Sequence, residues 1–374
     1  MNQMNPNLNG LIFWVQTGYV SFIGFVYYCA GVIVKRRRFV IKAHKHKVLY
    51  LLLLILALVT VGALLERGVR DSHNRTVGPK KILKLAFKTS SLDKISVCLC
   101  SPDREVRIVR GDGLVTGGSI FEGAGPGRKP GILLIHGNTG LGRRLAMYPV
   151  LGSKLAENGY VVLTLDLPGF GESDDPYSLG TPEALDEFKT VEAAVQYMIK
   201  NMSVSTENLT VIGHSRGTVM ALDAALNLEE VRKIILIGPV RRWRQRFADL
   251  GDRAYFWRRA QETHRFVYGT PFPDWYTADI WNKRVEKFAM EYYLEYFSRE
   301  GHKPVMFVDG ELEGQSDKLY LEKYYAAIEE PKKLVRLKRS DHYSNTAQSM
   351  GVIFYDKDVM EQLVHEITQW LEFS

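Results

Sequence analysis

The sequence is poor in cysteine, with three among its 374 residues. Cys29 lies within an apolar run, and Cys98 and Cys100 are two residues apart on one face of an expected strand, which leaves them too constrained to bridge comfortably. A framework of disulfide bonds and the paired spacing of a structural zinc site are both missing from the sequence. We therefore expect no metal site and no other cofactor, and a small disulfide-stabilised fold is excluded.

Outside one segment, residues 35–47, the sequence has no excess of positive charge. The formal net charge is +7, and the segment 35–47 alone carries seven lysines and arginines. The rest of the chain is therefore neutral in sum. Because a protein that binds nucleic acid needs a basic surface, we expect no nucleic-acid partner.

The first ten residues contain no lysine or arginine, which argues against a cleaved signal peptide. Two long apolar runs follow, at 11–34 and 48–65, and neither contains a charged residue. Each run is long enough to cross a hydrocarbon core of about 30 Å as a helix. We expect residues 1–65 to form a membrane anchor of two transmembrane helices, with the basic segment 35–47 as the loop between them.

The charge of this loop also predicts the orientation of the chain. Basic loops between spans stay on the cytoplasmic side, so the N-terminus and everything after residue 65 are expected on the non-cytoplasmic side. Basic residues between 67 and 84 favour the opposite orientation, but more weakly, because they are spread out and mixed with acidic residues. The sequence thus predicts a multi-pass membrane protein with a domain outside the cytoplasm.

The most informative motif is Gly213-His214-Ser215-Arg216-Gly217. It lies between an apolar run at 209–212 and a helix-forming run at 218–226. A strand, a sharp turn and a helix with serine at the apex would present the Ser215 hydroxyl above the edge of a sheet. Glycines two positions before and after the serine leave room for close contact between the strand and the helix. Because Gly-x-Ser-x-Gly alone arises often by chance, its weight depends on the other motifs.

Further motifs follow other apolar strands in a consistent order. They are the loop His-Gly-Asn-Thr-Gly at 136–140 after the strand 131–135, the turn Asp-Leu-Pro-Gly-Phe-Gly-Glu-Ser at 166–173 after the strand 160–165, the segment 309–313 after the strand 304–308, and Ser-Asp-His at 340–342 after the strand 334–337. Helices are expected near 143–157, 182–200, 217–226, 318–328 and 359–373. Strands alternating with helices predict a mostly parallel sheet covered on both faces.

These motifs, with serine, acid and histidine in that chain order, resemble those of the α/β-hydrolases over residues from about 90 to 374. The loop 136–140 and the turn 166–173 resemble the epoxide-hydrolase and haloalkane-dehalogenase branch, whose nucleophile is an aspartate. Ser215 stands at that position here. The resemblance therefore implies a serine hydrolase of the esterase, lipase, thioesterase or small-peptidase kind.

The resemblance also implies a role for individual residues. Ser215 would be the nucleophile and His342 the general base that takes its proton. The backbone N–H groups of Asn138 and Arg216 would form the oxyanion hole, which stabilises the charge on the tetrahedral intermediate.

The acidic partner of His342 is the member on which the chain departs from the family pattern. The usual pattern after this strand is His-Gly-x-x-Asp, and the chain has Asp-Gly-Glu-Leu-Glu at 309–313. We expect Glu313 to be the acid, with Asp317 and then Asp309 as alternatives. Asp317 would otherwise cap the helix near 318–328.

The segment before the hydrolase domain, 66–90, is expected to be a linker followed by a first strand. Leu83, Leu85 and Phe87 alternate with other residues, and this period of two favours a strand over a basic amphipathic helix on a membrane surface. The hydrolase domain would then occupy 91–374. Its first strands, near 95–100 and 105–109, would pair antiparallel at the edge of the sheet.

An aromatic-rich helical segment, 241–302, separates two of the expected strands and would form a lid over the site. Its aromatic side chains would either line an apolar tunnel for an acyl chain or form the core of the lid itself. The helical spacing of Trp281, Val285, Phe288 and Tyr292 fits the second interpretation.

Together these features predict a membrane-anchored serine hydrolase that cleaves esters of small-molecule or lipid-like acyl substrates. A thioesterase, a small peptidase and an acyltransferase use the same triad, so the sequence leaves these alternatives open. A non-catalytic binding or scaffold protein of the membrane is the alternative of another class.

Overall fold

The computed structural model describes residues 79–89, 91–239, 250–268, 271–299, 302–349 and 351–372. The two predicted transmembrane helices, the basic loop and most of the predicted linker lie outside these ranges. Within them, no helix combines the length and the apolar composition that crossing a membrane requires.

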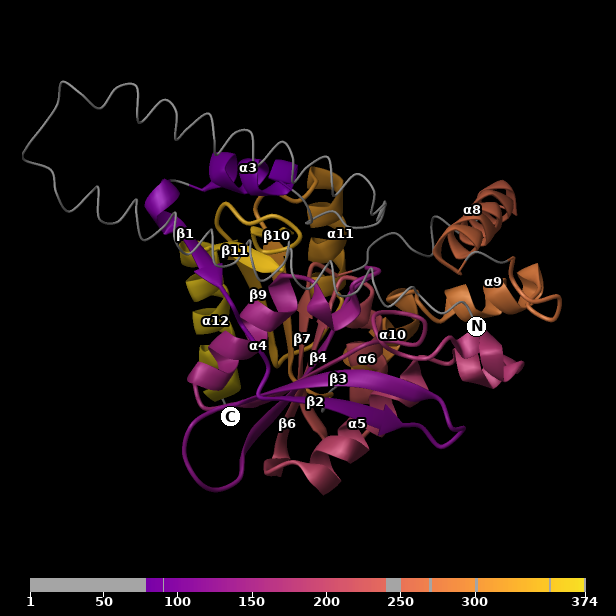
Figure 1. Ribbon diagram of the computed structural model, residues 1–374, viewed down its shortest axis with the longest axis horizontal. Helices are drawn as coiled ribbons and strands as arrows, with labels where there is room; N and C mark the ends of the chain where they lie inside the picture. The colour runs from indigo at the N-terminus through magenta and orange to yellow at the C-terminus, as the bar shows by residue number, and fades with distance from the viewer. Residues whose placement is uncertain are drawn as a thin grey trace, which may run out of the picture.

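A central sheet of eight strands organises the molecule, in the spatial order β2-β3-β5-β4-β6-β7-β8-β9 (Figure 1). Its strands are β2 Arg104–Val109, β3 Val115–Glu122, β4 Lys129–Ile135, β5 Val161–Leu165, β6 Val204–His214, β7 Val231–Ile237, β8 Val305–Gly310 and β9 Lys332–Leu337. β3 pairs antiparallel with both β2 and β5, and every pair from β5 to β9 is parallel. The parallel strands bring the loops at their carboxyl ends to one edge, where the predicted motifs lie.

Helices cover both faces of this sheet. The helices α4 Met147–Glu157 and α12 Lys357–Glu372 pack on one face, and α5 Phe188–Asn201, α6 Gly217–Asn227, α10 Glu291–Phe297 and α11 Gln315–Ala326 pack on the other. Short 3₁₀ turns lie at Leu92–Lys94 (η1), Gly142–Arg144 (η2), Pro176–Leu179 (η3) and Pro182–Leu185 (η4). This arrangement confirms the predicted mostly parallel α/β-hydrolase sheet.

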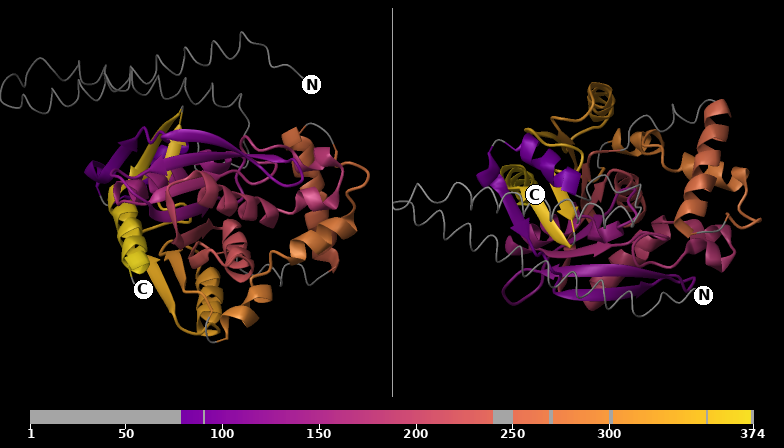
Figure 2. Two further views of the ribbon diagram at one scale, coloured as in Figure 1. Left: turned by 90° about the horizontal axis from the view of Figure 1, so that it is seen from below. Right: turned by 45° about the horizontal axis from the view of Figure 1, so that its top comes forward.

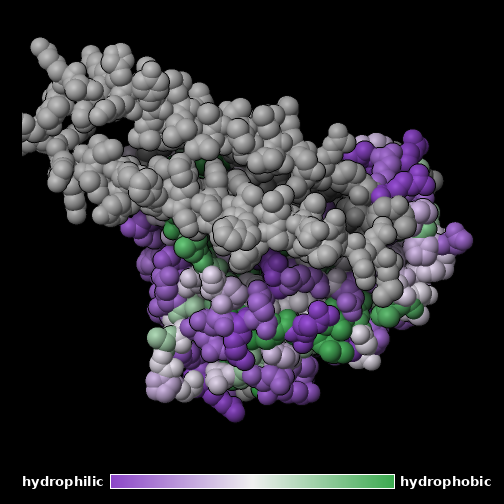
Figure 3. All heavy atoms as spheres, in the orientation of Figure 1, coloured by the Kyte–Doolittle hydropathy of each residue, from purple (hydrophilic) through white to green (hydrophobic). Residues whose placement is uncertain are grey.

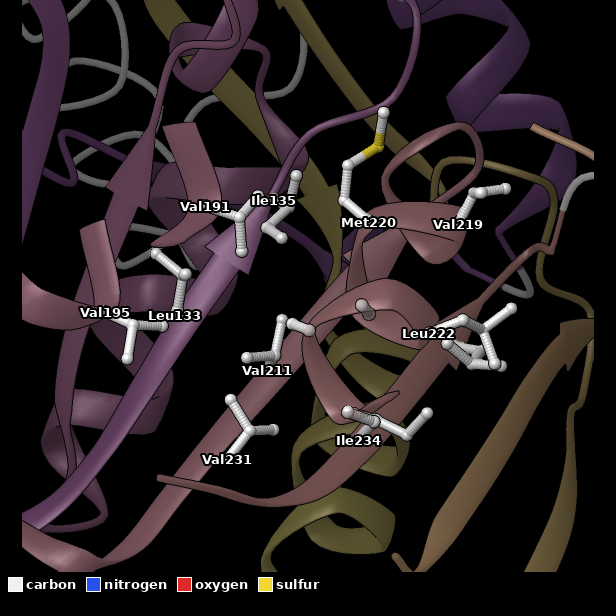
Figure 4. Packing of buried hydrophobic residues seen from close by; sticks show 14 of the residues in the cluster. Leu133, Ile135, Val191, Val195, Val211, Val219, Met220, Leu222, Val231 and Ile234 are labelled. Carbon is white, nitrogen blue, oxygen red and sulfur yellow. The ribbon is translucent and has the colours of Figure 1, made fainter. Parts of the chain in front are cut away.

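Alternation along the strands builds two cores, one on each face. In β4, Leu133 and Ile135 face the α5 and α6 side, while Ile132 and Leu134 face the α4 and α12 side. Figure 4 shows the first of these cores, where Leu133 and Ile135 lie close to Val191 and Val195 of α5. Because both faces are covered, the strands are apolar almost throughout, as central parallel strands must be.

The predicted strand in 80–88 is wrong, because Pro79–Lys88 forms the helix α3. Proline at the first helical position, followed by lysine, leucine and alanine, favours a helix. The alternation at 83–87 has another origin: Leu85 is buried, whereas Leu83 and Phe87 point outward. α3 packs on a second sheet of three strands, in which β11 Val352–Asp356 pairs antiparallel with β1 Ile95–Cys98 and β10 Thr346–Ser349.

The prediction that the strand near 95–100 belongs to the central sheet is therefore wrong. β1 pairs with β11, and the edge of the central sheet is formed by β2 with β3. Cys98, the last residue of β1, and Cys100, two residues later, are joined by a disulfide bond, with their Cα atoms 5.2 Å apart. That separation is ordinary for a disulfide, so the expectation that this pair would not bridge is also corrected.

The described part of the lid segment is helical, with α8 Leu250–Tyr268, α9 Ala278–Glu286 and the already described α10. Figure 1 shows α8 and α9 at one side of the molecule, away from the helices that cover the sheet. Trp281 and Val285 are buried against Leu185, and Trp257 stacks on Phe272 with ring centroids 5.3 Å apart.

These contacts favour the interpretation that the lid aromatics form its own core. Phe288 is buried as well, on the side of the central sheet, whereas Tyr292 is exposed. The tunnel for an acyl chain stays a prediction. In Figure 3, the part of this face that the described residues form is mostly hydrophilic, with hydrophobic residues scattered over it.

Candidate active site

Ser215 lies at the apex of the turn between β6 and α6. Its φ angle is 51°, in the left-handed region that residues other than glycine rarely adopt. The turn is tight because a Cβ atom on Gly213 would lie 2.2 Å from the carbonyl oxygen of Gly217, and one on Gly217 would lie 2.5 Å from that of Ile135. The Ser215 N–H donates to the carbonyl oxygen of Ile237 at 2.8 Å, which fixes the strained turn to β7.

His342 and Glu313 meet at the same edge of the sheet. His342 lies in the loop between β9 and β10, and Glu313 in the loop between β8 and α11. The His342 Nδ1 atom is 2.8 Å from Oε1 of Glu313. A carboxylate at Nδ1 holds the proton there and leaves Nε2 as the nitrogen that can accept a proton from a hydroxyl.

The loop that carries His342 is held by hydrogen bonds from its neighbours. Oδ1 of Asp341 accepts the N–H groups of Tyr343 at 2.9 Å and of Asn345 at 3.0 Å. Asn345 returns a bond, since its Oδ1 accepts the Asp341 N–H at 3.0 Å. Lys88, at the end of α3, forms an ion pair with Oδ2 of Asp341. Asp341 is thus engaged in shaping the loop.

The two alternative acids lie in different settings. Asp309 is buried within β8, and Asp317 lies in α11, with a side chain outside the described part of the structure.

Gly238, directly after β7, lies beside the catalytic pair. A Cβ atom on Gly238 would lie 2.9 Å from Nδ1 of His342 and 3.4 Å from Oε1 of Glu313. Only a glycine leaves space for the His342 and Glu313 pair at this point.

The loop after β4 is fixed through His136. Nε2 of His136 accepts the N–H of Leu167 at 2.9 Å, so Nδ1 carries the proton and donates it to the carbonyl oxygen of Gly137 at 2.6 Å. The Gly137 carbonyl and the Asn138 N–H belong to one trans peptide unit and point in opposite directions. His136 therefore turns the Asn138 N–H away from its own ring. Among the described residues, neither this N–H nor that of Arg216 has an acceptor.

A second network links this loop to His342. The N–H of Gly137 donates to the hydroxyl of Tyr148 at 2.8 Å, and that hydroxyl lies 2.8 Å from Nδ1 of His214. Nε2 of His214 lies 2.8 Å from the carbonyl oxygen of His342. Because a carbonyl only accepts, His214 is protonated at Nε2 and accepts the Tyr148 proton at Nδ1. Each donor in this series of hydrogen bonds, from Gly137 to His342, therefore has one acceptor.

Burial keeps both histidines of these networks neutral. It lowers the pKa of His136, and it lowers the pKa of His214 well below the ordinary value, with a further contribution from the nearby His342. Burial also raises the pKa of Tyr148, so its hydroxyl keeps the proton that it donates. Neither His136 nor His214 is suited to act as a second base.

The side chain of Arg216 is directed toward the lid. Its guanidinium forms an ion pair with Glu187, which also pairs with Arg284 of α9. The carboxylate of Glu187 is fully buried, and the Arg216 guanidinium lies over the ring of Phe288, 4.6 Å from its centroid. One buried carboxylate thus joins the nucleophile turn to the lid.

Asp166, in the turn after β5, also has a structural role. Its carboxylate is fully buried and pairs with Arg143. Its oxygens accept the N–H groups of Arg143 at 2.7 Å and of Glu172 at 2.9 Å. Asp166 therefore holds together the two glycine-rich turns beside the site.

The sequence identified the residues of the turn and loops but missed their supports. Tyr148 and Glu187 belong to no motif, and only their contacts show what they do. His214 was inside the recognised motif, yet its link to His342 depends on the fold. Within the described ranges, no group of three or more His, Cys, Asp or Glu side chains is arranged to hold a metal ion.

The fold and this arrangement define a hydrolase of the α/β class. The family model of the alpha/beta hydrolase fold matches residues 130–344, more than half of the chain. The chain belongs to the α/β-hydrolase fold family.

Curated relatives match a shorter segment. Alpha/beta hydrolase domain-containing protein 17C of Mus musculus is 28% identical over 155 residues, which is 41% of this chain and 43% of that protein. The human alpha/beta hydrolase domain-containing protein 17B is 30% identical over 122 residues, 32% of this chain and 39% of that protein. The chain thus spans about two fifths of the length of these relatives.

Solved structures share the fold at low identity. The DcsB structure in complex with its substrate analogue is 16% identical, with a TM-score of 0.50, and the match covers 72% of this chain and 97% of that one. An esterase of Pyrococcus furiosus is also 16% identical, with a TM-score of 0.49 over 73% of this chain and 91% of the other. At this identity the likeness shows the fold alone.

Proposed function

We propose that this protein is a membrane-anchored serine hydrolase that cleaves carboxylic esters of lipid-like or acyl substrates. The observation that carries the proposal is the 2.8 Å contact between His342 Nδ1 and Glu313 Oε1. This pair lies at the sheet edge where Ser215 occupies a turn with a φ angle of 51°. A histidine oriented by a carboxylate beside a strained, half-buried serine is the arrangement that activates a hydroxyl.

In the proposed reaction, the Ser215 oxygen attacks the ester carbonyl carbon while Nε2 of His342 takes the hydroxyl proton. The carbonyl oxygen becomes an anion that accepts the N–H groups of Asn138 and Arg216. The intermediate then collapses, the bond to the leaving oxygen breaks, and His342 delivers its proton to form the alcohol. Water, deprotonated by His342, attacks the acyl-serine and releases the carboxylic acid and the free serine.

Glu313 stays ionised throughout and stabilises the imidazolium that forms in each half of the reaction. His136 supports the oxyanion hole through the Gly137 carbonyl, which is 2.6 Å from its Nδ1. The anchor would lie in residues 1–65, whose two apolar runs, 11–34 and 48–65, are long enough to cross a bilayer. The hydrolase domain would then lie on the non-cytoplasmic side.

The chemistry is tested with the detergent-solubilised full chain and a series of p-nitrophenyl esters of increasing acyl length, next to thioesters of the same acyl groups. We expect turnover of the esters that Ser215→Ala abolishes. Faster turnover of the matched thioesters would make the protein a thioesterase. No turnover of either series by the folded wild type would favour the alternative of a non-catalytic binding protein.

The orientation is tested separately, by adding a protease to intact cells. If the domain lies outside the cytoplasm, cleavage is expected in the part of the predicted linker that precedes α3, residues 66–78. Protection of this segment in intact cells, with cleavage after the membrane is opened, would reverse the proposed orientation.

A further inference from the structure

We propose that α3 is a membrane-docking helix whose outer face lies on the headgroup region of an anionic lipid bilayer. The outer face of α3 is defined here by Leu83, Lys84 and Phe87. The proposal rests on the membrane anchoring proposed above, whichever side of the membrane the domain occupies, and adds a second, peripheral contact that sets how the hydrolase domain faces the lipid.

The first observation is the exposure of apolar side chains on α3. Phe87 is 90% exposed and Leu83 57%, whereas Leu85 is only 3% exposed. Among the described residues, Phe87 is the most exposed of the large hydrophobic side chains. Because residues four apart lie on the same face of a helix, Leu83 and Phe87 form one apolar strip directed away from the domain.

The inner face of α3 is already occupied. Leu85 packs with Ala347, Val352 and Phe354 of the three-stranded sheet, and Ile82 adds to this contact. Figure 1 and the right-hand view of Figure 2 both place α3 alongside β10 and β11. The helix is therefore fixed to the domain by its inner face, and its outer face is exposed.

Charge on the helix points to the chemistry of its partner. α3 contains four lysines and no acidic residue. Lys84 is exposed next to the apolar strip, and Lys88 is engaged by Asp341. A helix with a strongly segregated apolar face, lysines beside it and aromatic side chains lies in the interface of a bilayer and is attracted by anionic lipids.

The position of α3 in the chain favours a bilayer over another protein. The second apolar run ends at residue 65 and α3 begins at Pro79, so thirteen residues separate them. Fully extended, such a segment spans at most about 45 Å, and as a flexible chain it covers about 20 Å on average. A helix tethered this closely to a span meets the lipid surface at a high effective concentration.

Docking at α3 would also orient the active site. The ion pair of Lys88 with Asp341 joins the end of α3 to the residue before His342. The β10 strand beneath α3 begins four residues after His342. A bilayer in contact with α3 therefore lies near the loop of the catalytic histidine, where an acyl chain leaving the membrane would arrive.

The test is photo-crosslinking of the full chain with Ser215→Ala in nanodiscs of phosphatidylcholine and phosphatidylserine in equal amounts. The variant Phe87→p-benzoylphenylalanine places the probe on the outer face of α3. The same probe at Val109, which is 63% exposed on β2, is the matched control. We expect lipid adducts at position 87 and few at position 109. We also expect Lys84→Gln to lower the yield at position 87 about five-fold, the factor for one lysine near an anionic surface.

Other products would overturn the proposal. Adducts between position 87 and residues 1–78 of the same chain would show that its own segment covers the outer face, and adducts to a second copy would show a protein interface. Equal lipid adducts at positions 87 and 109, or none at 87, would also refute docking. Alkaline carbonate extraction of membranes containing the same protein tests the anchoring independently: release from the membrane would refute the anchor, whereas retention without adducts would refute α3 docking alone.

Discussion

The ring of His214, the residue before the candidate nucleophile, is bonded through Nε2 to the carbonyl oxygen of His342, the candidate base, at 2.8 Å. Through Tyr148 the same ring reaches the N–H of Gly137 in the oxyanion loop. A single buried chain of hydrogen bonds thus sets the spacing between the loops that carry the nucleophile, the base and the oxyanion hole. Displacing any one of the three would disturb the other two.

Removing the Tyr148 hydroxyl tests this network. In Tyr148→Phe, the Gly137 N–H and Nδ1 of His214 lose their partner in a fully buried site. We expect the free energy of unfolding to fall by about 1–3 kcal/mol, the cost of leaving a buried polar group unsatisfied. Denaturant unfolding measures this, and kcat should fall as well, because the Gly137 and Asn138 peptide units lose a support. Unchanged stability and unchanged kcat would contradict the role given to Tyr148.

Glu313→Gln tests which carboxylate serves His342. An amide cannot stabilise the imidazolium, and it can hold the ring in the wrong tautomer, so kcat should fall by about 10³- to 10⁴-fold. Asp317→Asn and Asp309→Asn are the matched controls for the alternative acids. Steady-state hydrolysis should single out Glu313. A larger loss of kcat in either aspartate variant would transfer the role to that residue.

Gly238→Ala tests the space beside the catalytic pair. The new Cβ would lie 2.9 Å from the His342 ring, and shifting the ring by about 1 Å is expected to cost about 10²-fold in kcat. Gly180→Ala is the control, since Gly180 also has a positive φ angle, 70°, but no atom lies within 4 Å of its added Cβ. Both variants carry the backbone strain, and only Gly238→Ala should lose activity. Equal activities would show that His342 tolerates the contact.

Glu187→Gln tests the buried carboxylate between the nucleophile turn and the lid. Arg216 and Arg284 would be left without their counter-charge, which is expected to cost about 3–5 kcal/mol in the free energy of unfolding. In Glu295→Gln, which removes an exposed pair with Arg299, the change should stay below about 0.5 kcal/mol. A small effect of Glu187→Gln in denaturant unfolding would show that the lid does not depend on this carboxylate.

The stability of the domain should depend on pH through His136 and His214. Burial lowers the pKa of both in the folded state below the ordinary value of 6.5. Below pH 6.5 the unfolded chain therefore binds protons that the folded chain does not, so the free energy of unfolding falls as the pH decreases from 6.5. Above this pH the contribution is fully present. The free energy of unfolding can be measured between about pH 7.5 and about pH 5. It should depend less steeply on pH in His214→Gln than in the exposed control His365→Gln.

The central sheet was predictable because its signal is local. Apolar runs such as 131–135 and 209–212 are the strands of a sheet covered on both faces, and the motif after each run marks its carboxyl end. β3 was missed because Gly117 and Gly118 interrupt its apolar pattern, although the strand is buried. β10 and β11 were missed because they are short, with four and five residues.

Other features depend on contacts between distant residues. The alternation of Leu83, Leu85 and Phe87 was assigned to a strand, but it reflects a helix that packs on one side and exposes apolar side chains on the other. The sequence predicted those parts of the site that lie within motifs, which are the turn with Ser215 and the loops with His342 and Glu313. The roles of Tyr148 and Glu187 follow from contacts with distant residues, such as His214, 66 positions from Tyr148, and Arg216, 29 positions from Glu187. The role of Gly238 follows from its closeness to His342 and Glu313. These contacts leave no pattern in the sequence.

The most direct test of the account is the labelling of the folded full chain with a fluorophosphonate, followed by mass spectrometry of the modified peptide. We expect a single adduct on Ser215, absent from Ser215→Ala and formed much more slowly in Glu313→Gln. A folded wild-type protein that forms no adduct, or one that is modified at another residue, would contradict the proposal that Ser215 is an activated nucleophile.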